Sequence, residues 1–421
     1  MDPVQDRLDA DFGPEFAPYA GRGGDFDLQP LRAALARLGD PHARLPPTFH
    51  VAGTNGKGST CAFLAAICEA AGLRAHAFTK PHLLYTRERV RLANAPVTDE
   101  LFLAAIDRVA ALAMPLRHFE AQLAAAFLMF AETPADALIL ETGMGGTLDA
   151  TNVIARPAAA IITPVDIDHT AALGATLAEI AAHKAGIVKP GAPVIVARQK
   201  PDALNVIEHR AEALDAPTYS LGLEWDAFAA NGRMVFQTAD ALLDLPLPAL
   251  LGRHQIENAG AAIMALRAPG HALSGDPRIT DDAIAAGVQS AFLPARLQRL
   301  RDETWLDGAH NPAGAHALAA ALKELDARAP RPTILIVGIL ARKDAPGILA
   351  ALRDAAGDLI AIPIRNEQHV AQSDLAHIAA SLGYAARTAS SLQEAIAQAH
   401  GARIVICGSL ALAAEALQLQ P

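Results

Sequence analysis

The stretch HVAGTNGKGST, residues 50–60, decides the fold of this chain. An apolar, β-prone run over Thr48–Gly53 leads into it, and a helical pattern over Ser59–Ala71 follows. A strand, a glycine-rich turn and a helix N-terminus in this order predict a phosphate-binding loop. Glycines let the backbone wrap around phosphate oxygens, and the first N–H groups of the helix point at the anion.

Lys57 is placed to reach the terminal phosphates of a nucleotide bound at this loop. The loop departs from the strict P-loop pattern at two positions. Val51 stands where the first glycine is usual, and Gly58 separates Lys57 from the hydroxyl of Ser59. The alternative interpretation, an ordinary glycine-rich turn, is disfavoured because both the strand and the helix are in place.

Outward from the loop, apolar β-prone runs alternate with helical patterns. Strands are expected at Thr48–Gly53, Arg74–Phe78, Ala137–Thr142, Ala158–Pro164, Pro193–Ala197, Thr304–Gly308, Thr333–Ile339, Leu359–Ile364 and Arg403–Gly408. Helices are expected at Ser59–Ala71, Glu120–Ala131, Leu177–Ala185 and Ala313–Ala327, and strands of a side sheet within Val235–Leu247. This rhythm predicts an α/β protein with mostly parallel sheets covered on both faces.

A proline-containing break at Phe292–Arg296 divides the pattern. We therefore expect a P-loop-type N-terminal domain over residues 1–295 and a smaller, Rossmann-like α/β domain over residues 296–421.

Composition excludes several classes of protein. Of 421 residues, 52% are hydrophobic and 19% charged, which is too apolar for a disordered chain. Mean hydropathy is +0.22, yet no apolar stretch is long enough to span a membrane. The net charge of −10 argues against a general nucleic-acid binder. Three cysteines form neither a disulfide framework nor a zinc pattern, and the N-terminus lacks a signal peptide, so we expect a cytoplasmic protein.

The loop resembles the ATP loop of the Mur ligase superfamily, and the glycine after Lys57 is similar to its folate branch, the folylpolyglutamate and dihydrofolate synthases. The resemblance runs from about Leu28 to about Leu412. It includes the blocks Pro81-His82-Leu83, Arg87-Glu88-Arg89-Val90-Arg91, Glu141-Thr142-Gly143-Met144-Gly145-Gly146, Leu148-Asp149-Ala150-Thr151-Asn152, Asp168-His169-Thr170, Lys184-Ala185-Gly186-Ile187, Gly252-Arg253-His254-Gln255, Arg296-Leu297-Gln298 and Leu306-Asp307-Gly308-Ala309-His310-Asn311-Pro312.

The resemblance implies a site for ATP and two Mg²⁺ ions. The implied nucleotide-binding residues are Thr54, Asn55, Gly56, Lys57, Gly58, Ser59, Asn258, Arg296 and Asp307. The implied metal-binding residues are Glu141, His169 and Lys184, and the implied catalytic residues are Lys57, His169, Lys184 and His310. With residues from both domains, the resemblance places ATP between them, so that closure assembles the site.

Lysine is scarce here: seven positions carry it among 35 basic residues. Lys184 matches the lysine that the family carries as a carbamate, a modification that arginine cannot undergo. Lys80 departs from the family, which has a metal-binding serine there; its ammonium either turns away from the metal or contacts a phosphate oxygen. Thr147 and His183 are further departures. Arg87, Arg89 and Arg91 alternate, which predicts either one basic strand face or a solvated surface.

The resemblance implies an ATP-dependent ligase that adds L-glutamate to dihydropteroate, to a folate, or to both, through an acyl phosphate. The implied partners are therefore small molecules, with no nucleic acid and no membrane, and we expect a monomer. Two alternatives remain: a peptidoglycan Mur ligase, disfavoured by Gly58 and the 252–255 block, and a nucleotide-binding protein that has lost ligase chemistry, to which Lys80 would point.

Overall fold

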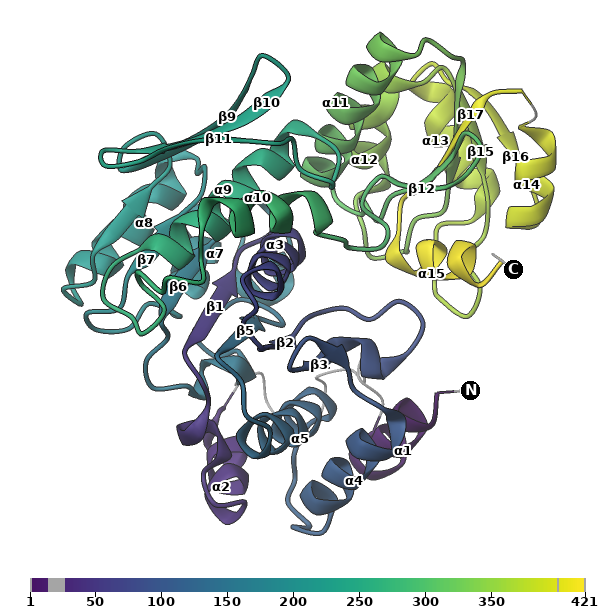
Figure 1. Cartoon of the computed structure of the whole chain (residues 1–421). Helices are drawn as coiled ribbons and strands as arrows, with labels where there is room; N and C mark the ends of the chain where they lie inside the picture. Colours follow the sequence, from purple (N-terminus) through teal and green to yellow (C-terminus); the bar gives the residue numbers. More distant parts are fainter. Residues whose placement is uncertain (1, 14–26, 400, 420–421) are drawn as a thin grey trace. The chain divides into compact units, whose positions relative to one another are not determined.

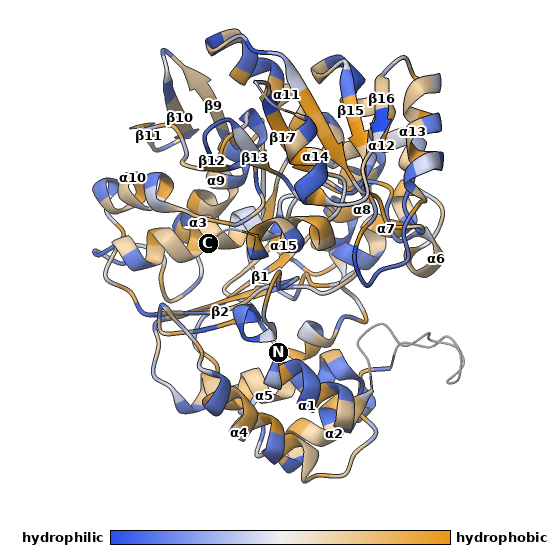
Figure 2. Ribbon diagram, turned by 90° about the vertical axis from the view of Figure 1, so that its right-hand side faces the viewer, coloured by the Kyte–Doolittle hydropathy of each residue, from blue (hydrophilic) through white to orange (hydrophobic). Residues whose placement is uncertain are grey.

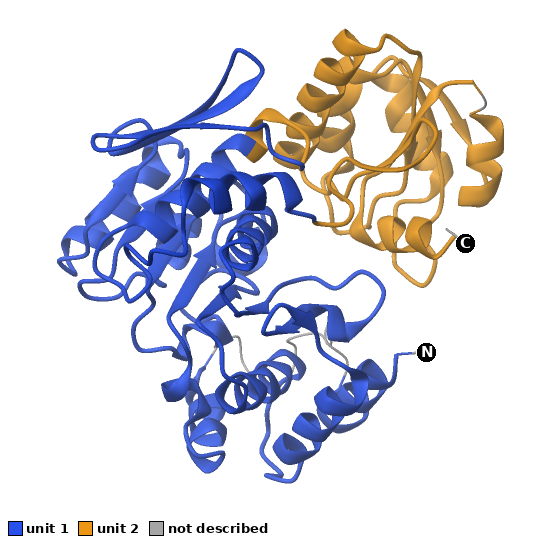
Figure 3. Cartoon of the chain, viewed as in Figure 1, with its two compact units in different colours: residues 1–249, 256–292 blue, residues 250–255, 293–421 orange. Residues whose placement is uncertain are grey.

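The computed structural model describes residues 2–13, 27–399 and 401–419. The chain divides into two compact units, coloured separately in Figure 3. Unit 1 comprises Met1–Ala249 and Ile256–Phe292, and unit 2 comprises Leu250–Gln255 and Leu293–Pro421. The functional boundary after residue 295 stays a prediction.

Unit 1 is built on an eight-stranded sheet in the order β4-β3-β2-β5-β1-β6-β7-β8 (Figure 1). Its strands are β1 (Thr48–Ala52), β2 (Ala75–Phe78), β3 (Val90–Leu92), β4 (Ala95–Pro96), β5 (Ala137–Glu141), β6 (Ala159–Ile162), β7 (Val194–Val196) and β8 (Thr218–Ser220). All pair in parallel except β3 and β4. Every residue of β1, β5 and β6 is buried, as expected for strands covered on both faces. The predicted parallel α/β sheet is confirmed.

Helices cover both faces of this sheet. They are α1 (Pro3–Phe12), α2 (Gln29–Arg37), α3 (Lys57–Ala70), α4 (Asp99–Ala110), α5 (His118–Glu132), α6 (Thr170–Leu173), α7 (Leu177–Ala185), α8 (Pro201–Glu212), α9 (Arg253–Arg267) and α10 (Asp281–Ser290), with 3₁₀ turns η1 (Pro41–Arg44), η2 (Thr86–Arg89) and η3 (Ala150–Val153). One apolar cluster joins α1, α2, α4 and α5 to β2 and β5, and another joins α7 and α8 to β6 and β7. Helix α3 packs on β1, β2 and β5 of this sheet.

Helix α10 packs closely against α3. A Cβ on Gly287 of α10 would lie 2.5 Å from the Cα of Ile67 on α3, so this glycine permits the close approach.

A separate antiparallel sheet, ordered β11-β10-β9, confirms the side sheet expected within residues 235–247. Its strands are β9 (Trp225–Ala230), β10 (Arg233–Thr238) and β11 (Leu242–Leu245). Alternate residues such as Met234 and Phe236 are buried, which is the period of a sheet with one covered face.

Of the two alternatives for Arg87, Arg89 and Arg91, the basic strand face is wrong. Arg87 and Arg89 lie on the 3₁₀ turn η2, and only Arg91 lies on β3. The Arg89 side chain is buried and donates to His82 Nδ1 and Gln122 Oε1, whereas Arg87 pairs with Asp99. The alternation of charge reflected separate tertiary partners rather than strand geometry.

Unit 2 contains a six-stranded sheet in the order β12-β13-β17-β14-β15-β16, parallel except at β12. Its strands are β12 (Gln298–Arg301), β13 (Thr304–Leu306), β14 (Thr333–Val337), β15 (Asp358–Ala361), β16 (Ala385–Thr388) and β17 (Arg403–Cys407). Its helices are α11 (Pro312–Arg328), α12 (Ala345–Leu352), α13 (Gln372–Ser381), α14 (Leu392–Gln398) and α15 (Leu410–Gln418), with the 3₁₀ turn η4 (Arg353–Ala355). Figure 2 shows β15 and β17 in the hydrophobic colour, as expected for buried central strands. Across the described residues, no helix combines the length and apolar character needed to cross a membrane.

Candidate active site

The glycine-rich loop connects β1 to α3, as the sequence predicts. Its backbone needs glycine at two positions. Gly53 has φ +152°, and a Cβ there would lie 1.8 Å from Thr163 Oγ1. Gly56 has φ +87°, and a Cβ there would lie 2.5 Å from Asn258 Oδ1. The loop is therefore held between the segment after β6 and the buried side chain of Asn258, which belongs to α9.

Hydrogen bonds fix this loop to the chain that follows β6. The N–H groups of Thr54 and Asn55 donate to the carbonyl of Pro164 at 2.9 and 3.2 Å. The Thr54 hydroxyl donates to the Asp166 carbonyl and accepts from the Asp166 N–H, both at 3.0 Å. Strand β6 neighbours β1 in the sheet. These hydrogen bonds therefore hold the loop in place at the edge of the sheet where an anion would bind.

Lys57 bends back over the loop. Its Nζ donates to the carbonyls of Gly53 at 3.0 Å and Thr54 at 3.2 Å. Ser59, in the first turn of α3, is buried. The positive side chain and the helix N-terminus thus lie at one end of the loop, which is the arrangement that attracts phosphate.

Lys184, on α7, reaches the same loop from a distant part of the chain. Its Nζ donates to the Gly53 carbonyl at 2.7 Å, and the residue is 4% exposed. Burial, and then the charge of Lys57, lower the pKa of Lys184 to about 7. Near neutral pH a substantial share of this amine is therefore unprotonated and nucleophilic.

Glu141 ends β5, beside β1, where its register partner is Val51. It is 3% exposed, and its Oε2 accepts the backbone N–H of Lys80 at 3.0 Å. The carboxylate thus lies at the carboxyl edge of the parallel sheet, next to the strand that leads into the loop. Ligands of α/β proteins bind at this edge.

Asp149 is a site residue whose role sequence reasoning missed, although it stands in a quoted motif. It accepts the N–H of Met144 at 2.7 Å and both the N–H and the hydroxyl of Thr151, at 3.0 and 2.5 Å. The Thr151 hydroxyl gives its one hydrogen to Asp149. His50 Nε2, which lies 2.8 Å from the hydroxyl oxygen, must therefore be the donor in that contact and carries the ring proton. Burial raises the pKa of Asp149. This buried chain of bonds fixes the glycine turn after Glu141.

His169 lies differently from the other predicted residues. It caps α6 with a left-handed backbone, φ +52°, and its side chain is 51% exposed. Its Nε2 lies 3.9 Å from Asp168 Oδ2. In the part of the chain that the structure describes, no cluster of three or more His, Cys, Asp and Glu side chains could hold a metal. The metal ligands Glu141, His169 and Lys184 therefore stay a prediction.

The remaining predicted residues lie in unit 2, at the carboxyl end of β13. Asp307 is half-buried and accepts the N–H groups of Leu297 at 2.7 Å and Ala309 at 2.8 Å. Burial raises the pKa of Asp307, and the charge of Arg296 opposes that rise.

His310 follows in the same turn, with Nδ1 2.9 Å from the Gly308 carbonyl. Arg296 Nη1 donates to the Ala295 carbonyl at 2.9 Å. The structure therefore brings Arg296, Asp307 and His310 together within unit 2.

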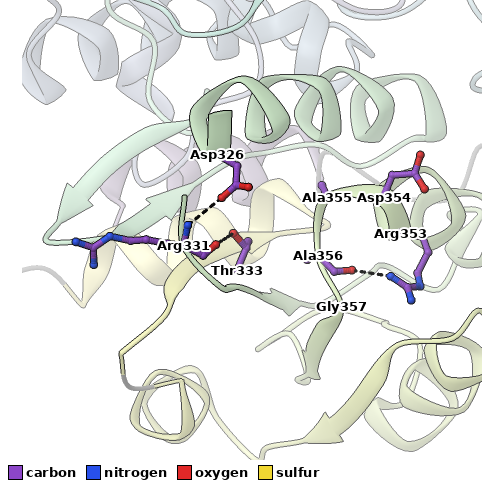
Figure 4. A pocket seen from close by; sticks show the side chains of 8 residues that line it. All are labelled: Asp326, Arg331, Thr333, Arg353, Asp354, Ala355, Ala356 and Gly357. Atoms are coloured by element: carbon purple, nitrogen blue, oxygen red, sulfur yellow. Dashed lines mark hydrogen bonds between the residues drawn. The ribbon is translucent and has the colours of Figure 1, made fainter. Parts of the chain in front are cut away.

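A hollow of about 590 Å³ elsewhere in unit 2 contains none of the predicted residues. Its polar lining is engaged internally. The Arg331 N–H donates to Asp326, and the Arg353 guanidinium donates to the carbonyl of Ala356 (Figure 4). The same guanidinium also donates to the carbonyls of Leu382 and Gly383. In that view the Arg331 side chain extends away from the other labelled residues. We find no functional role for this hollow.

Comparison with known proteins agrees with the geometry. The Mur ligase middle domain matches residues 51–266, and the Mur ligase glutamate ligase domain matches residues 295–410. The dihydrofolate synthase/folylpolyglutamate synthase of Bacillus subtilis is 36% identical over 310 residues, covering 70% of this chain and 71% of that protein. That of Escherichia coli is 31% identical over 402 residues, covering 94% and 91%. The chain belongs to this family of Mur ligases.

Solved structures of this ligase family superpose well on the chain. Escherichia coli FolC in complex with DHPP and ADP has a TM-score of 0.86 at 30% identity, covering 99% of this chain and 96% of that one. The Yersinia pestis bifunctional enzyme with AMPPNP and Mn ion has a TM-score of 0.85 at 30% identity, covering 95% of each. The family and the ligase class that the motifs indicated are confirmed.

Proposed function

We propose that this chain is an ATP-dependent ligase that joins L-glutamate to dihydropteroate or to a reduced folate and releases ADP and phosphate. The observation that carries the proposal is the loop between β1 and α3, with the amines of Lys57 and Lys184 both on the Gly53 carbonyl. Homologues of known structure bind ADP and AMPPCP, a divalent metal and DHPP, which supports the same ligands here.

The loop holds the phosphates of ATP. Backbone N–H groups at the start of α3 and the ammonium of Lys57 bind the phosphate oxygens, so Lys57 leaves its carbonyl partners when nucleotide arrives. The nucleotide-binding residues of unit 1 are Thr54, Asn55, Gly56, Lys57, Gly58, Ser59 and Asn258, the last of which faces the adenine.

The donors near the loop suit magnesium. Glu141 offers a buried carboxylate at the strand end, and Ser59 a buried hydroxyl. Both are hard oxygen ligands, which Mg²⁺ prefers. When bound, magnesium withdraws charge from the phosphate oxygens and so favours their attack by an anion. His169 would serve a second ion from the segment after β6.

Lys184 carries a carbamate in the active enzyme. Its unprotonated amine attacks CO₂, a nitrogen–carbon bond forms, and one proton leaves to solvent. The product is an anion that adds carboxylate-like oxygens beside the loop. The low pKa of Lys184 makes this reaction possible near neutral pH, since an ammonium cannot attack.

For three residues of unit 2 we propose the roles that the family resemblance implies. The guanidinium of Arg296 neutralises charge on the transferred phosphoryl group, Asp307 contacts the nucleotide, and His310 lines the site. Two backbone N–H groups hold the carboxylate of Asp307 in place.

The reaction proceeds in two steps. A carboxylate oxygen of the pteroate or folate attacks the γ-phosphorus, and the bond to the ADP oxygen breaks. The amine of glutamate then attacks the acyl carbon, the carbon–oxygen bond to phosphate breaks, and the amine loses a proton. The amide product and free phosphate leave.

The test is phosphate release from ATP in the presence of both glutamate and dihydropteroate, with product mass measured. We expect release only when both are present, and a mass gain of one glutamyl unit. Release with a UDP-sugar peptide in place of the pteroate would instead identify a peptidoglycan ligase. ATP binding without turnover on any acceptor would identify a nucleotide-binding protein that lacks ligase chemistry.

We propose a cytoplasmic location, on the basis of the cysteines. All three cysteines, Cys61, Cys68 and Cys407, are buried free thiols. Reduced thiols are typical of the cytoplasm.

A further inference from the structure

Gln199 follows β7, and its half-buried side chain reaches the end of the neighbouring strand β6. Its Oε1 accepts the N–H of Val165 at 3.0 Å. Its Nε2 donates to the carbonyls of Thr163 at 3.1 Å and of Ile162 at 3.3 Å. The amide thus uses its oxygen and both of its hydrogens on main-chain atoms, which fixes the path of the chain as it leaves β6.

The segment that Gln199 holds is the one that supports the phosphate loop. Pro164 lies between two of the hydrogen-bond partners of Gln199, and its carbonyl accepts the N–H groups of Thr54 and Asn55 at 2.9 and 3.2 Å. The contact is close, since a Cβ on Gly53 would lie 1.8 Å from a side-chain oxygen of this segment. Any shift of the segment therefore moves the loop, although Gln199 itself is one layer further out.

Two ion pairs flank Gln199 and restrain the chain less. Arg198 Nε lies 2.8 Å from Glu257 Oε1, and Lys200 Nζ lies 2.8 Å from Asp166 Oδ1. The arginine side chain is 65% exposed and the lysine side chain 60% exposed, so water and salt screen both pairs. The three hydrogen bonds of the Gln199 amide therefore provide most of the restraint on the segment after β6.

We propose that Gln199 is a positioning residue for the nucleotide: its amide holds the segment after β6, and that segment holds the phosphate loop in the shape that binds phosphate. This inference rests on the proposed function, in which the loop binds ATP, and adds a residue that acts on the loop without touching the ligand. A loop that is held ready binds more tightly because binding need not order it.

The size of the effect follows from the fraction of molecules in which the loop is ready. When that fraction falls, the apparent dissociation constant for the nucleotide rises by its inverse. Each of the three hydrogen bonds contributes modestly, and losing them together is enough to lower the fraction to about one tenth.

The test measures ADP affinity by calorimetry, with Mg²⁺ saturating, for wild type and three variants. Gln199→Met keeps the length of the side chain and removes all three hydrogen bonds. Gln199→Glu keeps the shape and the acceptor for Val165 but cannot donate to the two carbonyls when ionised. The control Gln237→Met changes an exposed glutamine of β10. We expect both Gln199 variants to bind ADP about 10-fold more weakly, and the control to match wild type.

Steady-state kinetics and urea unfolding separate positioning from a merely structural role. For positioning, the KM for ATP rises in Gln199→Met and Gln199→Glu, while the KM for glutamate stays at the wild-type value. A merely structural role would lower the free energy of unfolding and leave both KM values and the ADP affinity of the folded protein unchanged.

Three outcomes would overturn the inference. Equal ADP affinity of wild type and both Gln199 variants would show that the loop keeps its shape without the amide. An equal loss in Gln237→Met would show that the effect does not come from the segment after β6. Failure of the wild type itself to bind ADP would overturn the proposed function along with this inference.

Discussion

Lys57 and Lys184 donate to one carbonyl oxygen, that of Gly53, at 3.0 and 2.7 Å. One lysine begins the helix after the phosphate loop, and the other comes from α7. Two amines on a single acceptor are favourable only if their mutual repulsion is reduced, and the low pKa of Lys184 reduces it. The phosphates of a nucleotide, or a carbamate on Lys184, would relieve the same crowding.

Lys57→Ala should abolish turnover without unfolding the protein. Its Nζ donates to two backbone carbonyls of its own loop, so the truncation removes hydrogen bonds within the loop. Loss of one charged contact to a transferring phosphoryl group should lower kcat about 10²-fold or more. Steady-state phosphate release measures the effect, and an unchanged Tm is the control. Near-normal kcat would remove the loop from the mechanism.

Lys184→Ala should be inactive, and millimolar short carboxylic acids should partly restore its activity, because they supply the missing carboxylate. Lys184→Arg should remain inactive with or without the acids, since a guanidinium fills the space and forms no carbamate. Phosphate release with an acetate titration measures the rescue. Full activity of Lys184→Arg would exclude carbamate chemistry.

Stability should depend on pH through Lys184 in buffer depleted of CO₂. Its pKa is about 7 in the folded chain and near the ordinary lysine value of 10.5 in the unfolded chain. Below pH 7 both states are protonated and the burial penalty is complete. From pH 7 to 10.5 the unfolded state binds the extra proton, so stability rises with pH by on the order of 1.4 kcal/mol per unit.

Lys184→Met has no such proton, so its stability advantage over wild type should be constant below pH 7 and shrink as pH rises towards 10.5. Urea unfolding of the two proteins across pH 6–10 gives this difference. A difference that does not change with pH would mean that Lys184 keeps its ordinary pKa.

Gly53→Ala should weaken both folding and nucleotide binding. The added Cβ meets Thr163 Oγ1 at 1.8 Å, at a backbone angle that L residues disfavour. A cost of roughly 2–4 kcal/mol is expected from the clash and the strain. Gly357→Ala is the matched control, because a Cβ there meets nothing within 4 Å. Urea unfolding and ADP calorimetry on both variants decide, and equal behaviour of the two would refute the close contact.

Thr151→Val should destabilise unit 1 by about 1–3 kcal/mol, because it removes a buried hydroxyl that joins Asp149 to His50. Thr151→Ser keeps the hydroxyl and should recover most of the loss. Denaturant unfolding measures both variants. An unchanged free energy of unfolding in Thr151→Val would show that the two backbone donors alone hold Asp149.

The sequence by itself determined the phosphate loop and the sheet around it. Thr48–Ala52 is apolar and β-prone, Gly53 and Gly56 permit the turn, and a helix pattern follows, so local chemistry alone specifies strand, loop and helix. The motif blocks also determined the family, because each block is recognised from its own residues and their order along the chain.

Only the tertiary structure decided which side chains meet. Arg89 and Arg91 alternate in the sequence as two residues on one face of a strand would. In the structure Arg89 lies on a 3₁₀ turn, and its buried side chain donates to His82 and Gln122. Lys80 meets Phe119, and Lys184 meets Gly53, because neighbouring strands end at one edge of the sheet and α5 and α7 pack beside it. Those contacts, the burial that lowers the pKa of Lys184 and the exposure of His169 arise from packing between distant segments, which no local pattern in the sequence encodes.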